Sequence, residues 1–423
     1  MKPERFTAKV FLCVIMGMMM FSVLSFAVRK TEKLMEEKKV VVDWKKLYPF
    51  EDRETHSAEP EKESLYKYVK HGLEGYTSEA LLRYYSIVEV AKKYEDIVRW
   101  NMSPVFDYNA VVRLKDGYLT TYQVSLDVAP AAEAVKDFAD FCAERGSDFV
   151  YINFPTKICV SEDKEISGVL DFANQNADKF LAMLTEYGVR NYDFRKNLHA
   201  AGMNHHEAFY VTDHHWKAET GLWAAGEILK ILRDDLSWDV KPEILRPENF
   251  EYVIYPEWFL GSQGKKVTLA RAKPDNFTMI YPKFDTQLHI EIPIVNVNVS
   301  GDLTSFYDME QVKNKDYYNY KLSIYGTYSY GDQALITANN KLALNTKRLL
   351  VIHDSFSDCV IPFLSLGVSH LDAIDLRHFT GSLRTFIETV KPEAVIVEYN
   401  AEMPGRYSSF SATQGSKKLY DFR

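Results

Sequence analysis

The sequence predicts an α/β protein: a parallel β-sheet with helices on both faces and a β-rich insertion, preceded by an N-terminal transmembrane helix. Strand-like and helix-like segments alternate from about residue 110 onward, as they do in parallel sheets covered by helices. Short apolar runs at 348–352 and 394–397 have the length and composition of buried parallel strands. An uncharged apolar run at 10–28 approaches the ~20 residues that a membrane-spanning helix needs.

The N-terminal segment has the charge pattern of a membrane anchor. Basic residues precede the apolar run, so residues 1–9 are expected to stay in the cytoplasm and residues 10–28 to span the membrane. A cleaved signal peptide is the alternative, because Ser25-Phe26-Ala27 resembles a cleavage site. Both interpretations place the rest of the chain outside the cytoplasm. The first predicts a single-pass protein of the cell membrane with an extracytoplasmic catalytic domain.

Residues 29–108 are expected to form a stalk and a helical spacer. The sequence is rich in charge up to about residue 67, and apolar residues recur at helical spacing from 65 to 100. The domain that carries the chemistry is therefore expected to span residues 109–423.

Composition excludes some classes of partner and site. The formal net charge is −8, whereas a general nucleic-acid-binding protein would need a basic stripe. The chain has 4 cysteines, which are scattered and form neither a disulfide framework nor a CxxC metal motif. We therefore expect no nucleic-acid partner, no cofactor and no metal.

The spacing of apolar residues predicts the elements of the first half of the domain. Alternation with a period of two indicates strands, and helical spacing indicates helices. In chain order, the predicted elements are a hairpin at 111–118, a helix at 131–142, a strand at 148–154, a helix at 179–187, a strand at 192–194 and a helix at 218–235.

The second half begins with the β-rich insertion, at about 238–340, where helical spacing is weak. We expect this insertion to form part of a substrate cleft. The predicted elements of this half are strands at 278–281, 288–292 and 295–299 within the insertion, strands at 348–352, 371–376 and 394–397 after it, and a helix at 356–366.

Two distant stretches contain residues that suit acyl-transfer chemistry. Asp213 precedes His215 by two positions, and in an extended chain such side chains share a face, so the carboxylate can orient the imidazole. Ser355 follows the apolar strand at 348–352, at the sheet edge where open α/β folds place their sites. A serine nucleophile needs an oriented base of this kind. Backbone N–H groups at a helix start can stabilise an oxyanion.

Other interpretations of the same residues remain open. A serine after a strand often serves only as a helix N-cap, and an Asp-x-His pair often forms an ordinary turn. His205, His206, His214 and His215 with Asp213 form a dense cluster that resembles a zinc ligand set, but no HExxH or similar spacing is present. A zinc-dependent hydrolase and a non-catalytic glycan-binding or scaffold protein are therefore the alternatives to a serine enzyme.

The stretch from Tyr210 to Trp216 resembles the signature of the bacterial DHHW protein family. That family is related to the SGNH hydrolase-like acetyltransferases of periplasmic alginate O-acetylation. The similarity covers about residues 110–400. It extends to the segments Asp116–Leu119, Pro155–Lys157, Gly261–Ser262, Val351–Phe356, Pro362–Leu364 and Asp375–Arg377.

The resemblance implies an SGNH-hydrolase-like fold and a function. Ser355 would be the nucleophile, His215 the base and Asp213 its partner. The reaction would be O-acyl, and specifically O-acetyl, transfer to or from a cell-envelope or exported polysaccharide through an acyl-serine intermediate. A membrane-bound acyl-passing partner is also implied by the family, and not by any residue of this chain.

One part of the family pattern differs in this sequence. His353 replaces the residue expected two positions before the serine, and no clear block of oxyanion donors is present. The candidate oxyanion or substrate-contacting residues are Gly261, Ser262, Asn400, Tyr330 and His214, of which His214 is assigned a structural or substrate-edge role.

Overall fold

The computed structural model describes residues 111–114, 116–159, 171–269, 271–313, 315, 317, 323–404 and 419–423. The predicted cytoplasmic N-terminus, membrane anchor, stalk and spacer lie outside these residues. Among the described residues, no helix combines the length and the apolar character needed to cross a membrane.

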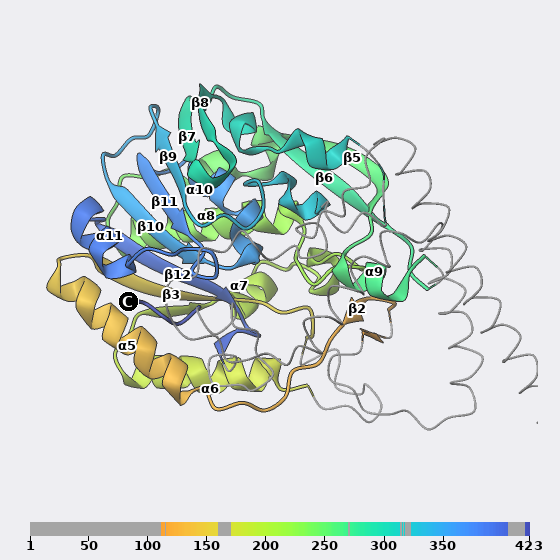
Figure 1. The fold of residues 1–423 in the computed structure, drawn as a ribbon, viewed down its shortest axis with the longest axis horizontal. Helices are drawn as coiled ribbons and strands as arrows, with labels where there is room; N and C mark the ends of the chain where they lie inside the picture. Colours follow the sequence, from red (N-terminus) through yellow and green to blue (C-terminus); the bar gives the residue numbers. More distant parts are fainter. Residues whose placement is uncertain are drawn as a thin grey trace, which may run out of the picture. The chain divides into compact units, whose positions relative to one another are not determined.

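A mixed central sheet organises the domain (Figure 1). Its strands, in spatial order, are β4 (Asn191–Asp193), β3 (Asp148–Phe154), β12 (Ala394–Asn400), β10 (Arg348–His353), β11 (His370–Ile374), β9 (Ile336–Asn340), β7 (Leu288–Ile292) and β8 (Val297–Gly301). The first five strands run parallel. The last three continue the sheet in antiparallel pairs.

The mixed α/β class is therefore confirmed, but the expectation of a parallel sheet holds only for part of it. β7 and β8 are joined by the short 3₁₀ turn Pro293–Val295, and antiparallel strands can be joined in this way whereas parallel strands need a long crossover. The alternating apolar pattern of these strands predicts their existence but not their direction.

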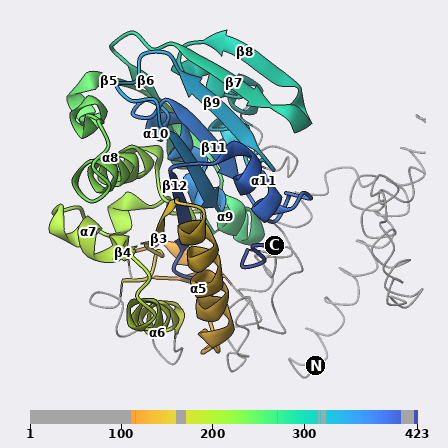
Figure 2. The same cartoon turned by 90° about the vertical axis from the view of Figure 1, so that its left-hand side faces the viewer.

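Helices cover both faces of the sheet (Figures 1 and 2). Successive residues of β10 belong to different cores: Leu349 and Val351 to one, Leu350 and Ile352 to the other. The first core includes residues of α7 (Phe194–Ala200), α8 (Ala218–Asp234) and α10 (Ile361–Leu364). The second includes residues of α5 (Ala129–Glu144), α6 (Ala173–Glu186) and α11 (Leu383–Val390).

The strands of the β-rich stretch at 238–340 belong to two different sheets. β5 (Phe250–Phe259) and β6 (Asp275–Pro282) form a separate antiparallel ribbon, and the short helix α9 (Ser262–Val267) lies between them in sequence. Strands β7, β8 and β9 instead extend the main sheet. A further small hairpin pairs β1 (Val112–Arg113) with β2 (Leu119–Thr120), as the sequence predicted.

The helix predicted at 356–366 is broken into two pieces. A 3₁₀ helix spans Ser355–Cys359, and α10 follows it over four residues. Pro362 lies in the first turn of α10, where its missing N–H costs nothing, whereas the interior of one continuous helix would not tolerate it.

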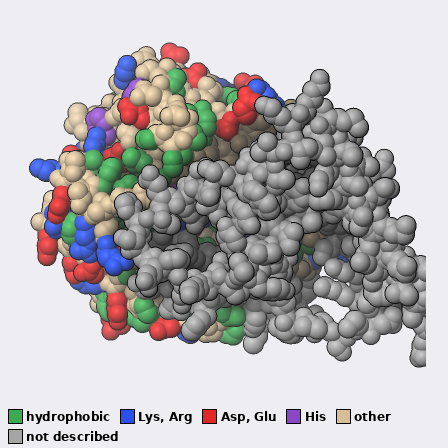
Figure 3. Space-filling model, in the orientation of Figure 1, with side chains coloured by type: hydrophobic (Ala, Val, Ile, Leu, Met, Phe, Trp, Pro, Cys, Tyr) green, Lys and Arg blue, Asp and Glu red, His purple; other side chains and the backbone are tan. Residues whose placement is uncertain are grey.

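The surface of the described residues carries both signs of charge. On the face drawn in Figure 3, Lys and Arg side chains lie among Asp and Glu side chains. This mixed distribution agrees with the net charge of −8 and gives no basic stripe on the visible described surface.

Candidate active site

The structure brings Asp213, His215 and Ser355 together at the carboxyl end of β10. His215 Nε2 lies 2.7 Å from Ser355 Oγ, and His215 Nδ1 lies 2.6 Å from Asp213 Oδ1. Asp213 and His215 are buried, whereas Ser355 is partly exposed. The three side chains therefore form one hydrogen-bonded line that ends at a hydroxyl reachable from solvent.

The stretch from Tyr210 to Trp216 forms a closed loop, and the extended geometry assumed from the sequence is wrong. Tyr210 N–H donates to the His215 carbonyl at 3.2 Å, and Phe209 bridges to Trp216. Asp213 Oδ1 also accepts the His215 backbone N–H at 3.1 Å. A local turn in which one carboxylate oxygen contacts both the backbone and the ring therefore aligns the pair.

The carboxylate of Asp275 fixes this loop through hydrogen bonds. It accepts the backbone N–H groups of Val211 and Thr212 at 2.7 and 2.8 Å, and the Thr212 hydroxyl at 2.5 Å. Asp275 is buried and was not identified from the sequence. No motif marks it, because it lies 62 residues beyond Asp213 and its partners are backbone groups.

The turn that carries Ser355 is held by two side chains. Asp354 Oδ1 accepts the Phe356 N–H at 3.0 Å, and its Oδ2 accepts the Asn400 N–H of the neighbouring strand at 2.8 Å. Trp216 Nε1 donates to the Phe356 carbonyl at 2.8 Å. The loop at 210–216 and the turn that carries Ser355 are thus hydrogen-bonded directly to each other.

Aromatic rings enclose the His215 imidazole. The Tyr325 ring stacks on it at 4.0 Å between centroids and 8° between planes, and Phe356 lies 5.2 Å away. Tyr325 is buried, and its hydroxyl reaches the Phe356 carbonyl at 3.2 Å. This tyrosine comes from the β-rich stretch and fixes the plane of the imidazole. The sequence contains many tyrosines and gave no signal to single it out.

Asp213 is held as a carboxylate. Although its burial acts to raise the pKa, the imidazoles of His214 and His215 and the hydrogen bonds from His215 and the Ser262 N–H hold the pKa of Asp213 well below its usual range. The Ser262 N–H donates to Asp213 Oδ2 at 2.6 Å. A stable negative charge at this position suits a group that orients an imidazole and stabilises its protonated form.

Lys157 is a second buried group that contacts this loop. The sequence placed it only in the family-like segment Pro155–Lys157 and gave it no role. Its ammonium donates to the Asp213 carbonyl, to the Leu119 carbonyl at 2.6 Å and to Gln263 Oε1 at 3.2 Å. Burial lowers the pKa of Lys157 to about 7, although nearby carboxylates, Asp213 first among them, oppose that shift.

The predicted oxyanion donors near Asp213 are occupied by other acceptors. The Gly261 N–H donates to Thr212 Oγ1 at 2.9 Å, and the Ser262 N–H donates to Asp213. An added Cβ at Gly261 would lie 2.3 Å from the Asp213 Cβ. A side chain larger than that of glycine at position 261 would therefore clash with Asp213.

The remaining candidates, Asn400, Tyr330 and His214, each make contacts of a different kind. Asn400 donates its side-chain N–H to the Pro155 carbonyl at 2.7 Å and its backbone N–H to Asp354. Tyr330 lies in a turn with a positive φ of 58°, and its partly buried side chain packs against the first core. His214 is exposed, and its ring lies 3.8 Å from the His215 ring between centroids, at an angle of 37°. His353 is buried and precedes the turn that carries Ser355.

The histidines of the zinc alternative are separated in the structure. The donor atoms of Asp213, His214 and His215 lie within 4.8 Å of one another, so these three could hold a metal ion. His206 instead contacts Asp116, and His205 contacts the Thr156 carbonyl at 2.8 Å. Since both ring nitrogens of His215 already lie at hydrogen-bond distance from Asp213 and Ser355, the geometry favours a serine triad over a metal at this site.

Comparisons with known proteins agree with this fold. Residues 115–250 match the family described as SGNH hydrolase-like domain, acetyltransferase AlgX. PatB1 of Bacillus cereus, solved with a sulfonyl adduct, aligns with a TM-score of 0.58 and 18% identity over 73% of this chain and 97% of that one. A DHHW family protein of Eubacterium siraeum aligns with a TM-score of 0.54 and 16% identity over 76% of this chain and 97% of that one. No curated protein matches the sequence.

These matches confirm the resemblance to SGNH hydrolase-like proteins, including a DHHW family member. At such low identities, the solved structures establish a shared fold and not shared chemistry. The family match contains Asp213 and His215 but ends well before Ser355. Only the three-dimensional structure, and not the family match, places Ser355 beside His215.

Proposed function

We propose that this protein transfers O-acyl groups, specifically acetyl, to or from a cell-envelope or exported polysaccharide through an acyl-serine intermediate. The observation that carries the proposal is the hydrogen-bonded line Asp213–His215–Ser355, with links of 2.6 and 2.7 Å. The match of residues 115–250 to an acetyltransferase family supports acetyl as the group transferred.

The geometry suits a two-step reaction. Ser355 Oγ attacks the acyl carbonyl carbon while His215 Nε2 takes the hydroxyl proton. Asp213 keeps the Nδ1–H of His215 in place and stabilises the imidazolium that forms. The tetrahedral intermediate then expels the donor alcohol, which receives the proton from His215. A sugar hydroxyl, or water, next gives its proton to His215 and attacks the acyl carbonyl carbon. The bond from that carbon to Ser355 Oγ then breaks, Oγ takes the proton back from His215, and the acetylated sugar, or acetate, leaves the free enzyme.

The oxyanion of the intermediate needs N–H donors close to Ser355. The Ser355 N–H begins the 3₁₀ helix Ser355–Cys359, where helix geometry supplies no acceptor for it. We assign this N–H as one donor. The Gly261, Ser262 and Asn400 backbone N–H groups already have acceptors, so we do not assign them as further donors.

We place the reaction outside the cytoplasm, behind the predicted N-terminal anchor at 10–28. Acetyl transfer there needs a donor that reaches that side of the membrane. A membrane-bound partner that passes acyl groups to Ser355 would meet this need. A hydrolytic protein would need no such partner.

A kinetic competition tests the proposal. The purified protein is mixed with an aryl acetate, and release of the aryl alcohol is followed with and without neutral, acidic and acetylated polysaccharides. Release by the wild type but not by Ser355→Ala is expected, and acceptors that accelerate it should become acetylated. Equal release by both proteins would contradict the proposal. Release without any acetylated acceptor would identify an esterase.

A further inference from the structure

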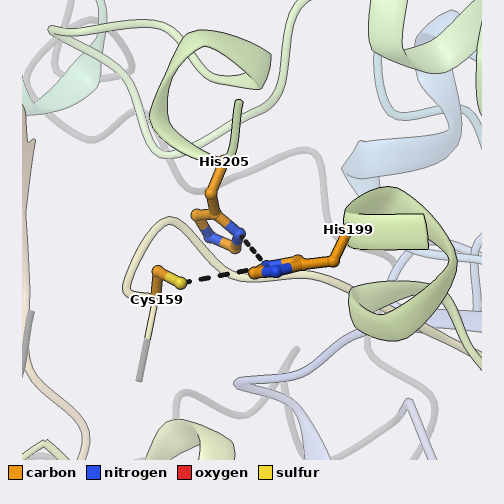
Figure 4. Close-up of side chains that lie close together, drawn as sticks. All are labelled: Cys159, His199 and His205. Carbon is orange, nitrogen blue, oxygen red and sulfur yellow. Dashed lines mark hydrogen bonds between the residues drawn. The ribbon is translucent and has the colours of Figure 1, made fainter. Parts of the chain in front are cut away.

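A second cluster of reactive side chains lies outside the triad. Cys159 follows β3, His199 lies on α7, and His205 precedes a short 3₁₀ turn, yet their side chains converge (Figure 4). Cys159 Sγ lies 3.8 Å from His199 Nε2, and His199 Nε2 lies 3.2 Å from His205 Nδ1. All three donor atoms lie within 4.8 Å of one another.

Two of these separations are close to those between ligands of one tetrahedral ion. With Zn–S of about 2.3 Å and Zn–N of about 2.05 Å, tetrahedral angles place sulfur about 3.6 Å from nitrogen and the two nitrogens about 3.3 Å apart. The observed distances are 3.8 and 3.2 Å. Two of the three ligand pairs are thus spaced much as a tetrahedral ion would hold them, and the third pair, Cys159 Sγ and His205 Nδ1, lies within 4.8 Å.

The second nitrogen of His205 supports the same interpretation. Its Nε2 lies 2.8 Å from the Thr156 carbonyl, which can only accept, so Nε2 carries the proton and Nδ1 presents a lone pair to the cluster. Metal-binding histidines are usually oriented by a backbone carbonyl in this way. His205 is buried and its ring stacks on Phe209 at 5.5 Å between centroids, so its orientation is fixed.

We propose that Cys159 Sγ, His199 Nε2 and His205 Nδ1 bind one borderline-soft divalent metal ion, Zn²⁺ by ligand type. One thiolate with two imidazoles suits zinc rather than magnesium or calcium. Cys159 binds as the thiolate and releases its proton to solvent. Three protein ligands leave the fourth tetrahedral position to water, which can enter beside His199 because this side chain is exposed.

The ion would fix the position of the segment Thr156–Cys159, which contacts the loop that carries Asp213 and His215. Thr156 accepts the His205 hydrogen bond, and Lys157 of the same segment donates to the Asp213 carbonyl. A metal that ties Cys159 to α7 and to His205 would therefore hold Lys157 in position under Asp213. The site itself contains no residue of the triad, so its existence does not depend on the proposed reaction.

Cobalt binding tests the site independently of activity. Tag-free full-length protein is stripped with a chelator and titrated with Co²⁺, whose tetrahedral visible bands and thiolate-to-cobalt band report the ligands. One ion per chain with the thiolate band is expected. Cys159→Ser should lose that band. His199→Gln, at an exposed position, should weaken binding by more than the roughly 10–100-fold that loss of an outer-shell partner costs.

Control variants distinguish this site from other possible metal sites. Cys142→Ser and His289→Gln alter a buried cysteine on α5 and a histidine on β7, and both should bind Co²⁺ as the wild type does. Asp213→Asn should also leave binding unchanged, whereas an ion at Asp213, His214 and His215 would be lost. The proposal is overturned by absence of stoichiometric binding, or by binding that survives both Cys159→Ser and His199→Gln.

Discussion

Trp216 Nε1 donates a hydrogen bond of 2.8 Å to the carbonyl of Phe356, the residue that follows the proposed nucleophile. The loop that carries the base and the turn that carries Ser355 are 140 residues apart in sequence, and this bond joins them inside the core. Trp216 is fully buried. The alignment of His215 with Ser355 therefore depends on this indole as well as on the triad itself.

Replacement of Trp216 by Phe should weaken both stability and turnover. The variant keeps an aromatic ring but removes the N–H, leaving the Phe356 carbonyl with the more distant Tyr325 hydroxyl at 3.2 Å. Because the carbonyl keeps that partner, the lost hydrogen bond should cost about 0.5–1.5 kcal/mol, and turnover should fall as Ser355 shifts. Urea unfolding and aryl-acetate kinetics measure the two effects. Unchanged values for both would show that the bond does not position the nucleophile.

Replacement of Gly261 by Ala should disturb Asp213. The new Cβ would lie 2.3 Å from the Asp213 Cβ, and overpacking of this kind costs about 1–3 kcal/mol. We expect a lower kcat together with lower stability. Gly226→Ala on α8 is the control, because its new Cβ would have only Leu245 nearby, at 3.9 Å. That control should be neutral or slightly stabilising, since Ala favours a helix interior by up to about 1 kcal/mol over Gly.

Replacement of Asp213 by Asn should abolish most turnover while preserving shape. The amide can no longer both accept the Nδ1–H of His215 and stabilise its positive charge. In serine triads such a change lowers kcat by about 10⁴-fold, and KM should change little. Steady-state kinetics provide the measurement. A loss of less than about 10-fold, well short of the triad effect, would show that His215 needs no carboxylate partner.

Glu398 should make stability depend on pH. It is buried on β12 opposite His353 of β10, near Asp354 and the Ser357 hydroxyl. Burial raises the pKa of Glu398 from 4.5 to about 8. The folded chain keeps a proton that the unfolded chain loses, so this contribution to stability is full below pH 4.5 and is lost as pH rises to about 8.

The Glu398→Gln variant isolates this effect. The free energy of unfolding of the wild type, minus that of the variant, should fall by a few kcal/mol over this pH range, at about 1.4 kcal/mol per pKa unit. Urea unfolding at a series of pH values measures it. A difference that stays flat with pH would show that Glu398 titrates normally.

Local patterns predicted much of the fold. The strands at 148–154 and 288–292 have the predicted bounds, because alternating or continuous apolar residues mark buried strands directly. The helix α8 likewise lies within one residue of its prediction. Strand β9 was not predicted at all. The antiparallel direction of β7 and β8 and the breaking of the helix after Ser355 depend on tertiary packing, which apolar periodicity does not report.

The candidate site was predictable only where chemistry and spacing coincide. Asp213 and His215 are two residues apart, and Ser355 follows a clear strand, so these could be proposed from sequence. Tyr325 and Asp275 act through stacking or through backbone N–H groups, which leave no motif. Lys157 lies in the family-like segment Pro155–Lys157, but that pattern gave it no role. The cluster of Cys159, His199 and His205 has no recognisable ligand spacing, and its members meet only after folding.

Formation of an acyl-serine tests the central claim most directly. The purified protein is incubated briefly with an activated acetyl ester, quenched in acid and measured by intact mass. The wild type should gain one acetyl group, located on Ser355 by peptide mapping, and Ser355→Ala should gain none. His215→Ala should form the adduct far more slowly. An adduct that forms equally on wild type and Ser355→Ala, or on a residue other than Ser355, would contradict the proposed mechanism.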